Sequence, residues 1–231
     1  MTVTLITGAN KGLGYESARR LLALGHTVYV AARDPSLGQD AATALGARFV
    51  QLDVTSDDSV AAAAETVLAE AGHLDVLVNN AGITGGRIAI PDVTGADAMR
   101  IFDTNVAGMV RVIHSFLPLL EKSTNPVIVN VSSGLGSFAV TQDPTRMESR
   151  YPTLLYSASK SAMVMLTTQY AKALPGMRIN VCDPGYTATD LNGHNGTQTV
   201  QEGTDAIVTL ATIDTTGPTG TFIDRHGPVG W

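Results

Sequence analysis

Tyr156 and Lys160 have the residue types and the spacing that proton transfer requires. They stand four residues apart in a stretch with helical periodicity, so both side chains leave the same face of the expected helix. A free phenol has a pKa near ~10, which is too high for efficient proton transfer at neutral pH. A nearby ammonium group favours the phenolate and lowers this pKa. The pair therefore suits a general acid or base, although the same spacing also occurs on ordinary amphipathic helices.

Two further polar groups are expected beside this pair. Ser132 and Ser133 follow the apolar run 127–131, and Asn105 begins a long helical stretch. Both places fall on the same edge of the sheet described below. A hydroxyl and an amide at that edge could hold a carbonyl oxygen and a water molecule. These neighbours favour catalysis over simple amphipathicity for the tyrosine and lysine pair.

A glycine-rich turn follows the first apolar run and leads into a helical stretch. It reads Thr-Gly-Ala-Asn-Lys-Gly-Leu-Gly from Thr7 to Gly14. Glycines let the backbone turn sharply and approach a pyrophosphate, and the free amides and dipole of a helix start favour its charge. The glycine spacing is four then two, not the two then three of the standard dinucleotide motif, so a tight turn without a ligand is the alternative. Its place between a strand and a helix favours nucleotide binding.

The residues after the second apolar run bear on which dinucleotide would bind. In an NAD site an acid near this point accepts hydrogen bonds from the ribose 2′-hydroxyl, whereas an arginine accommodates the 2′-phosphate of NADP. Ala32 is followed by Arg33, and Lys11 in the glycine turn could add a second positive charge. A guanidinium binds phosphate oxygens through charge-assisted hydrogen bonds, so we expect NADP(H) in preference to NAD(H). The alternative is that Arg33 is solvated and Asp34, about 20 residues past Gly14, serves NAD.

Two later strand ends carry further polar groups. Asp53 could hydrogen-bond the adenine edge of a cofactor, or it could cap the turn before Ser56. Asn79-Asn80-Ala81-Gly82 follows the fourth apolar run and places amides and a small residue at one strand end. Open α/β sheets bind ligands at this edge.

The elements that must position these residues alternate along the chain. Short apolar, β-branched runs separated by Ala- and Leu-rich helical stretches are typical of βαβ units and a parallel sheet covered on both faces. The expected strands are 3–7, 27–32, 48–52, 76–79, 127–131, 179–182 and 220–223. The expected helices include 12–24, 35–45, 57–71, 105–121 and 156–174. The pattern predicts an α/β fold with a doubly wound, parallel, seven-stranded sheet and a single domain over 1–231, with loops at 142–152 and 192–203.

Composition excludes several classes of protein. The chain has 231 residues, 44% hydrophobic and 16% charged, with a net charge of −6 and one cysteine. Such a chain is neither disordered nor collagenous, and it has no basic tract to bind nucleic acid or an anionic membrane. It shows no secretory leader and no apolar run near the ~20 residues of a membrane span. The five histidines have no ligand spacing, so we expect no metal, and we expect a cytoplasmic protein.

Taken in order, these motifs resemble the short-chain dehydrogenases/reductases, whose fold is the Rossmann fold. The resemblance covers nearly the whole chain, and its finer features resemble the NADPH-dependent carbonyl reductase branch. The motifs that carry it are Thr7 to Gly14, Asn79 to Gly82, Asn105, Val129-Asn130-Val131-Ser132-Ser133, the Tyr156 and Lys160 pair, and Asp183-Pro184-Gly185.

The resemblance implies a role for each catalytic residue. Tyr156 would protonate a carbonyl oxygen as hydride arrives from the nicotinamide, or act as the base in the reverse direction. Lys160 would lower the pKa of Tyr156 and hold the ribose hydroxyls. Ser133, rather than Ser132, would hydrogen-bond the substrate oxygen, and Asn105 would hold a water that links Lys160 to solvent.

The resemblance also implies a cofactor site in which the segment after the sixth strand fixes the nicotinamide carboxamide. The expected cofactor-binding residues are Gly8, Asn10, Lys11, Gly12, Leu13, Gly14, Arg33, Asp53, Val54, Asn80, Ala81, Gly82, Tyr156, Lys160, Pro184, Gly185, Thr187 and Thr189.

Two departures from the family pattern concern the substrate. Ser133 and Tyr156 are 23 residues apart, which is longer than in most of the family and implies an extra loop at 142–152. The segment after Thr189 is short where many relatives have a covering helix. We therefore expect an open pocket that accepts bulky or varied carbonyl compounds.

Alternative functions remain at this stage. The same fold could be a non-catalytic NADP(H)-sensing protein, but such proteins typically lose the tyrosine or the lysine. A lyase, epimerase or dehydratase would usually need a substrate domain for which the chain has no room. We expect a small-molecule carbonyl or alcohol substrate, and a monomer or homodimer in preference to a homotetramer.

Overall fold

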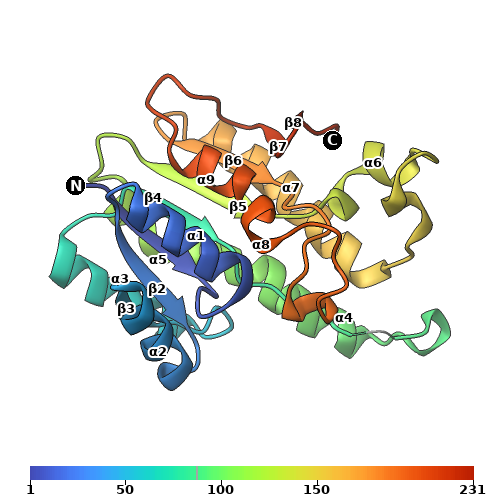
Figure 1. The fold of residues 1–231 in the computed structure, drawn as a ribbon, viewed down its shortest axis with the longest axis horizontal. Coiled ribbons are helices and arrows are strands. Elements are labelled where there is room, and N and C mark those ends of the chain that lie inside the picture. The colour runs from blue at the N-terminus through green and yellow to red at the C-terminus, as the bar shows by residue number, and fades with distance from the viewer. Residues whose placement is uncertain (87) are drawn as a thin grey trace.

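The computed structural model describes residues 1–86 and 88–231, and the strands in these ranges form one sheet (Figure 1). The strand order is β3-β2-β1-β4-β5-β6-β7-β8, and neighbouring strands are parallel except β7 and β8. The strands are β1 (Val3–Thr7), β2 (Thr27–Ala32), β3 (Arg48–Gln51), β4 (Val76–Asn79), β5 (Val127–Val131), β6 (Arg178–Cys182), β7 (Phe222–Asp224) and β8 (Gly227–Pro228).

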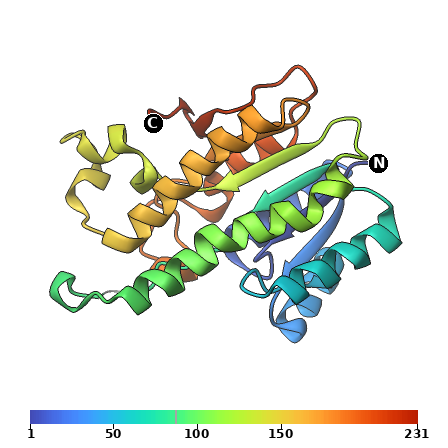
Figure 2. The same ribbon diagram turned by 180° about the vertical axis from the view of Figure 1, so that it is seen from behind.

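Helices cover both faces of this sheet, as Figures 1 and 2 show from opposite sides. The α-helices are α1 (Gly12–Ala23), α2 (Pro35–Leu45), α3 (Asp57–Ala71), α4 (Gly95–Phe102), α5 (Gly108–Leu120), α6 (Phe138–Gln142), α7 (Leu154–Ala173), α8 (Val200–Gly203) and α9 (Asp205–Ala211). Side chains of α1, α2 and α9 pack against one face, and those of α3, α5 and α7 pack against the other. The predicted α/β architecture with a doubly wound, mainly parallel sheet is confirmed.

The apolar runs form central strands because both faces of the sheet are buried. In β1, Leu5 belongs to the core on the α3–α5–α7 side and Ile6 to the core on the α1–α2–α9 side, and neither is exposed to solvent. Burying each such side chain contributes about 1.5–3 kcal/mol. Strands that are buried on both faces are therefore continuously apolar.

Helix starts use the capping residues present in the sequence. Asp34 accepts a hydrogen bond from the Leu37 amide at the start of α2, and Ser56 accepts one from the Ser59 amide at the start of α3. A side-chain cap of this kind satisfies one of the amides that the first helical turn leaves unpaired. These two helices consequently have the predicted bounds.

The structure adds elements that the sequence pattern did not predict. The two-residue strand β8 makes an eighth strand in the described sheet. Four predicted strands keep their bounds, two differ by one residue at one end, and the strand predicted at 220–223 differs at both ends from β7. The helix expected at 105–121 begins later, at Gly108, because a π-helical turn (Asp103–Ala107) joins it to α4. The segments 142–152 and 192–203 are not wholly irregular, since they contain a 3₁₀ turn (Met147–Arg150) and α8.

The sheet topology determines where ligands can bind. The strand order reverses between β1 and β4, and both connections leave from the carboxyl ends of their strands. Such a switch point opens a crevice at that edge of a doubly wound sheet. The strands β5 and β6 continue the same edge, so four strand ends converge on one region.

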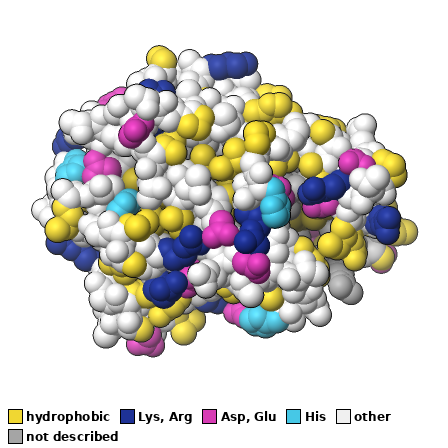
Figure 3. Space-filling model, turned by 45° about the horizontal axis from the view of Figure 1, so that its top comes forward, with side chains coloured by type: hydrophobic (Ala, Val, Ile, Leu, Met, Phe, Trp, Pro, Cys, Tyr) yellow, Lys and Arg dark blue, Asp and Glu magenta, His cyan; other side chains and the backbone are white. Residues whose placement is uncertain are grey.

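One face of the surface and the helices of the described ranges bear on charge and on membrane crossing. On the face shown in Figure 3, basic and acidic side chains are interspersed, and no single sign dominates it. Within the two described ranges, no helix combines the length and the apolarity that crossing a membrane requires.

Candidate active site

Tyr156 and Lys160 lie one turn apart on α7, and their side chains meet as the spacing predicts. The Lys160 ammonium nitrogen is 5.7 Å from the centroid of the Tyr156 ring. Lys160 is only 4% exposed, and its Nζ donates a hydrogen bond of 2.8 Å to the carbonyl oxygen of Val131 at the end of β5. Burial lowers the pKa of Lys160 to about 8, although the neighbouring Cys182 and Asp183 favour its charged form.

The phenol of Tyr156 is held in its protonated form. Burial raises its pKa, the negative charge of Asp183 raises it further, and a hydrogen bond with Ser133 lowers it. The net direction is upward, whereas the sequence predicted a pKa lowered by Lys160. A phenol in this environment keeps its proton until negative charge develops beside it, which suits a general acid.

The two serines after β5 have different tasks. The Ser132 hydroxyl is buried and donates to the carbonyl oxygen of Lys160 at 3.1 Å, so it fixes the strand end against α7. Ser133 is partly exposed, and its Oγ accepts a bond of 3.2 Å from the Leu135 amide while also reaching Tyr156. Ser133 therefore has the position to contact a substrate oxygen, and Ser132 does not.

Asn105 lies in the π-helical turn, and its side chain makes three hydrogen bonds within the protein. Its Oδ1 accepts a hydrogen bond of 2.8 Å from the Ile83 amide, and its Nδ2 donates to the Ile83 carbonyl at 2.9 Å and to Ser159 Oγ at 3.0 Å. The wider π turn is a common way to turn a helical residue towards a functional site. In this structure Asn105 ties the segment after β4 to α7 beside the catalytic pair.

The glycine turn after β1 is locked to the end of β4. Thr7 Oγ1 accepts hydrogen bonds of 3.0 Å from the amides of Asn80 and Ala81, and Asn80 Nδ2 donates to the carbonyl of Thr7 at 2.8 Å. A Cβ atom on Gly14 would lie 2.6 Å from Asn80 Nδ2 and 2.6 Å from the Gly8 carbonyl oxygen. Only glycine allows the start of α1 to approach the strand ends this closely.

Other expected members of the cofactor site line the same edge. A Cβ atom on Gly82 would lie 3.3 Å from Asn105 Oδ1 and 3.6 Å from Lys160 Nζ, so the segment after β4 reaches the catalytic pair. A Cβ atom on Gly12 would lie 3.7 Å from Thr189 Cγ2, and one on Gly203 of α8 would lie 2.8 Å from Leu13 Cδ2. Asn10 lies within the turn itself.

At the tip of β2 the two candidate residues for the ribose separate. Asp34 uses its Oδ1 as the cap of α2, accepting from the Leu37 amide at 3.0 Å. Arg33 is exposed, and its positive charge contributes to a lowered pKa at Asp53, where hydrogen bonding by Thr55 is the larger cause. The structure thus leaves the guanidinium available at this point and places the carboxylate at a helix start.

Lys11 has a partner that the sequence did not indicate, and Asp53 has one in the turn before Ser56. Lys11 Nζ lies 2.9 Å from Asp190 Oδ2, in an exposed ion pair that also links the glycine turn to the segment after β6. Asp53 Oδ1 accepts from the amide and the hydroxyl of Thr55, at 2.9 and 2.7 Å. Asp53 Oδ1 therefore makes the hydrogen bonds of a turn, as one of its two interpretations predicted. The neighbouring Val54 is buried and packs against Gly108.

The segment after β6 is held in a fixed shape. Gly185 has a φ of +69°, and its amide donates to Asp183 Oδ1 at 2.8 Å. Thr187 Oγ1 donates to the carbonyl oxygen of Pro184 at 2.9 Å, and both Thr187 and Thr189 are buried. Asp183 was quoted from the sequence only as part of a motif, and its buried carboxyl group is the main contact that sequence reasoning missed.

The described residues fit a dinucleotide and offer no metal centre. The glycine turn gives a backbone cradle that any side chain at Gly14 would fill, and the free amides of α1 point into the same edge. Among residues 1–86 and 88–231, no three His, Cys, Asp or Glu side chains are grouped to hold a metal ion.

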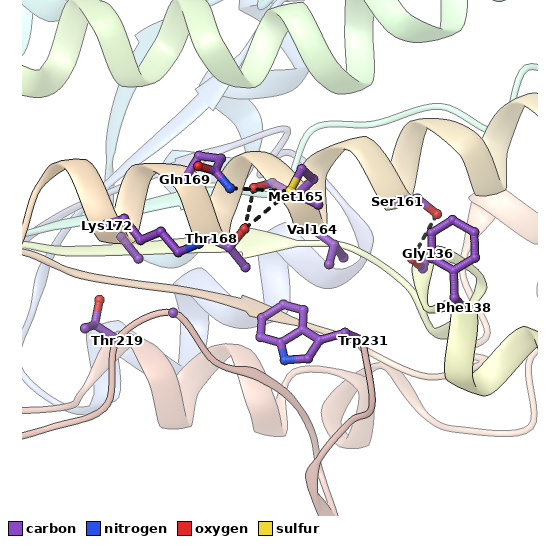
Figure 4. Close-up of a pocket in the computed structure, with 12 residues that line it drawn as sticks. Gly136, Phe138, Ser161, Val164, Met165, Thr168, Gln169, Lys172, Thr219 and Trp231 are labelled. Carbon is purple, nitrogen blue, oxygen red and sulfur yellow. Dashed lines mark hydrogen bonds between the residues drawn. The ribbon is translucent and has the colours of Figure 1, made fainter.

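A separate apolar hollow of about 560 Å³ lies along α7, beside Thr219 and Trp231 (Figure 4). It also contacts Phe138 and Met165, but its lining includes none of the expected catalytic or cofactor-binding residues. It is therefore not part of the candidate active site.

Comparison with known proteins agrees with this geometry. A family model described as short chain dehydrogenase matches residues 2–199. The chain is 36% identical over 224 residues to the short-chain dehydrogenase anuI of Penicillium roqueforti, covering 91% of this chain and 88% of that protein. It is 28% identical to a (+)-neomenthol dehydrogenase of Capsicum annuum, covering 96% and 95%. The structure of NADPH-bound carbonyl reductase from chicken fatty liver superposes with a TM-score of 0.87 at 28% identity over 100% of both chains.

We expect the substitution Gly14→Ala to weaken binding of a dinucleotide by at least about tenfold. The added methyl group would collide with Asn80 and with the Gly8 carbonyl, so the start of α1 would have to move away from the strand ends. Quenching of protein fluorescence by NADPH measures the affinity. Gly176→Ala is the matched control, because no atom lies within 4 Å of the added methyl there. Equal affinities for the two variants would contradict the cradle.

Proposed function

The chain belongs to the short-chain dehydrogenase family, and from this premise we propose that it catalyses the NADPH-dependent, reversible reduction of a ketone or aldehyde to an alcohol. The observation that carries the proposal is the meeting of three groups at one strand edge. A protonated Tyr156 contacts Ser133, and the buried ammonium of Lys160 lies beside its ring. Carbonyl reduction needs an acid, a hydrogen-bond donor and a nearby positive charge in this arrangement.

The proposed chemistry divides between cofactor and protein. When bound, NADPH supplies the hydride that adds to the carbonyl carbon. Tyr156 donates its phenolic proton to the carbonyl oxygen, and Ser133 donates a hydrogen bond to the same oxygen. Lys160 stabilises the phenolate that Tyr156 becomes, because the ammonium is close and little exposed. In the oxidative direction the same phenolate accepts the proton of the alcohol.

Proton return to Tyr156 must pass from solvent along the residues beside Lys160. Asn105 is buried at 1% exposure and is hydrogen-bonded to Ile83 and Ser159, so it holds the path between the segment after β4 and α7 in one shape. We propose that it positions the water that connects Lys160 to solvent. Its own amide acts through this positioning and not as an acid.

The cofactor would be held along the whole strand edge. The glycine turn from Gly8 to Gly14 would receive the pyrophosphate, and Asn80 to Gly82 would lie beside the ribose and nicotinamide. Asp53 and Val54 would face the adenine end, while Pro184 to Thr189 would orient the carboxamide. Lys160 would also hold the nicotinamide ribose.

Two contacts favour NADPH over NADH. Asp34 Oδ1 accepts the capping hydrogen bond of α2, which occupies one of the two oxygens of this carboxylate. Arg33 is exposed at the neighbouring position, and Lys11 on the glycine turn is a second basic residue, whose ammonium is paired with the exposed Asp190. A 2′-phosphate gains charge-assisted hydrogen bonds from such groups, whereas a 2′-hydroxyl gains little.

The substrate is proposed to be a bulky or varied carbonyl compound. Exposed apolar and aromatic side chains stand on the two segments that flank the site, with Met147 and Tyr151 on one and Tyr186 and Leu191 on the other. Only the four-residue helix α8 follows Leu191 before α9 in the described chain, so selectivity rests on these two segments. The similarity to a (+)-neomenthol dehydrogenase and to a carbonyl reductase supports the same substrate class.

We expect Tyr156→Phe to lower the rate of NADPH oxidation with a reactive diketone or quinone by about 10²–10⁴-fold, because it removes the general acid. NADPH should bind both proteins with similar affinity, since the phenyl ring is kept. Initial rates at 340 nm and a fluorescence titration measure these two quantities. Tyr170→Phe, on the same helix, is the matched control and should keep the full rate. Equal rates for Tyr156→Phe and the unchanged protein would refute the assigned acid.

We expect Arg33→Ala to raise the KM for NADPH by about tenfold or more and to change the KM for NADH little, because the guanidinium contacts only the 2′-phosphate. Steady-state rates with each cofactor give the comparison. Arg19→Ala, which removes an exposed arginine on α1 that pairs with Glu16, serves as the control. An equal effect of Arg33→Ala on both cofactors would return Asp34 to the role of ribose acceptor.

A further inference from the structure

A buried carboxyl group lies in the active site without a part in the proposed reaction. Asp183 follows β6 directly and is 5% exposed. An ionised carboxylate that deep in a protein is costly unless hydrogen-bond donors compensate for the lost water. The hydrogen-bond partners of this carboxylate therefore indicate its role.

The carboxylate joins two segments of the candidate site. Asp183 Oδ1 accepts a hydrogen bond of 2.8 Å from the amide of Gly185, in the turn expected to hold the nicotinamide. Gly134, directly after Ser133, also lies against this carboxylate, and its amide lowers the pKa of Asp183. The approach is close, since a Cβ atom on Gly134 would lie 2.8 Å from Asp183 Oδ2. One side chain thus links the ends of β5 and β6.

Titratable and charged groups face Asp183 from each of the elements packed around it. On α7 the neighbours are Tyr156 and Lys160, and on β6 it is Cys182. Glu148 approaches from the 3₁₀ turn before α7, with its Oε1 within 3.1 Å of the Cβ position on Gly134. Asp224 of β7 also contributes negative charge, and Arg146 faces the group while holding Glu148 at 3.2 Å.

We propose that Asp183 is a positioning residue, whose carboxylate clamps the Gly134 and Gly185 amides and so fixes the nicotinamide-binding turn at a set distance from Ser133 and Tyr156. This inference rests on the proposed function for its meaning in catalysis, while the clamp itself concerns the shape of the cofactor site. Hydride transfer depends on such distances, because a misplacement of about 1 Å can cost on the order of 100-fold in rate.

The clamp requires an ionised carboxylate, and this makes it sensitive to pH. Burial raises the pKa of Asp183, the Gly185 and Gly134 amides lower it, and the charges of Glu148 and Asp224 raise it, with a net upward shift. Because the pKa lies above that of an ordinary aspartate, the carboxylate is lost at a higher pH as the solution is acidified. NADPH affinity and turnover should therefore fall on the acidic side at a pH above the ordinary range of aspartate.

Three substitutions separate this role from a merely local turn. Asp183→Asn keeps the size of the side chain but turns one acceptor into a donor facing an amide. Glu148→Gln removes a neighbouring negative charge and leaves the clamp intact. Asp214→Asn is the matched control, because Asp214 also accepts from the amide two residues later, Thr216, at 2.8 Å, but lies in an exposed turn outside the site.

The experiment measures the NADPH dissociation constant by fluorescence and kcat for a reactive diketone across pH 4.5 to 9, with circular dichroism to confirm folding. We expect Asp183→Asn to weaken NADPH binding by about tenfold at neutral pH, the size of a lost hydrogen bond to a charged group, and to lack the acidic fall. Glu148→Gln should reach the same plateau kcat with the acidic fall moved to lower pH. Asp214→Asn should match the unchanged protein throughout.

The outcomes distinguish the inference from the proposed function. The clamp is overturned if Asp183→Asn binds NADPH as the unchanged protein does, or keeps its acidic fall, or if Glu148→Gln leaves that fall where it was. If Asp183→Asn does not fold, the position of the fall in Glu148→Gln decides alone. If the unchanged protein reduces no carbonyl compound but its NADPH affinity shows the acidic fall and the Glu148→Gln shift, the proposed function fails and the clamp stands.

Discussion

The candidate site depends on one ammonium group that is held almost out of water. Lys160 donates to the carbonyl oxygen at the end of β5 and lies beside the ring of Tyr156, while only 4% of it is exposed. A charge in so little solvent acts strongly on its neighbours, but it also has to be compensated by donors and acceptors around it. The hydrogen bond to Val131 fixes α7 against the sheet and at the same time sets the position of the tyrosine.

The surrounding polar contacts hold the carboxyl ends of the strands together at the same edge of the sheet. Thr7 and Asn80 lock β1 to β4, and Asn105 locks the segment after β4 to α7 through Ser159. The contacts of Asp183 complete the series by linking the segments after β5 and β6. Each contact spans elements far apart in the sequence, so the geometry of the site follows from the parallel sheet that brings these ends together.

Much of this arrangement could be predicted from the sequence. The apolar runs identified the strands because both faces of the sheet are buried, and the spacing of Tyr156 and Lys160 predicted that their side chains lie together on one face of α7. The role of Ser133 stays a prediction, and Ser132 donates its hydroxyl to the Lys160 carbonyl. These features are local, or they repeat with the period of a strand or a helix.

The remaining features depend on contacts that no local pattern encodes. The π turn at Asn105 arises where α4 and α5 join and cannot be read from helical periodicity. The pairing of Lys11 with Asp190 spans most of the chain, and the expected lowering of the Tyr156 pKa was reversed by burial, which only the fold determines. Asp183 entered the sequence analysis only as part of a motif. Its proposed positioning role rests on its buried contacts with Gly185 and Gly134, which only the fold determines.

Deuterium transfer tests the central claim most directly, namely that this strand edge brings hydride and the Tyr156 proton to one carbonyl group. The protein would be incubated with NADPH carrying deuterium at both positions of nicotinamide C4 and with a reactive diketone, and the alcohol product would be analysed by mass spectrometry. We expect one deuterium on the carbinol carbon and a hydroxyl proton that exchanges with water. Turnover that yields alcohol without deuterium at that carbon, or no alcohol across a panel of carbonyl compounds, would contradict the account.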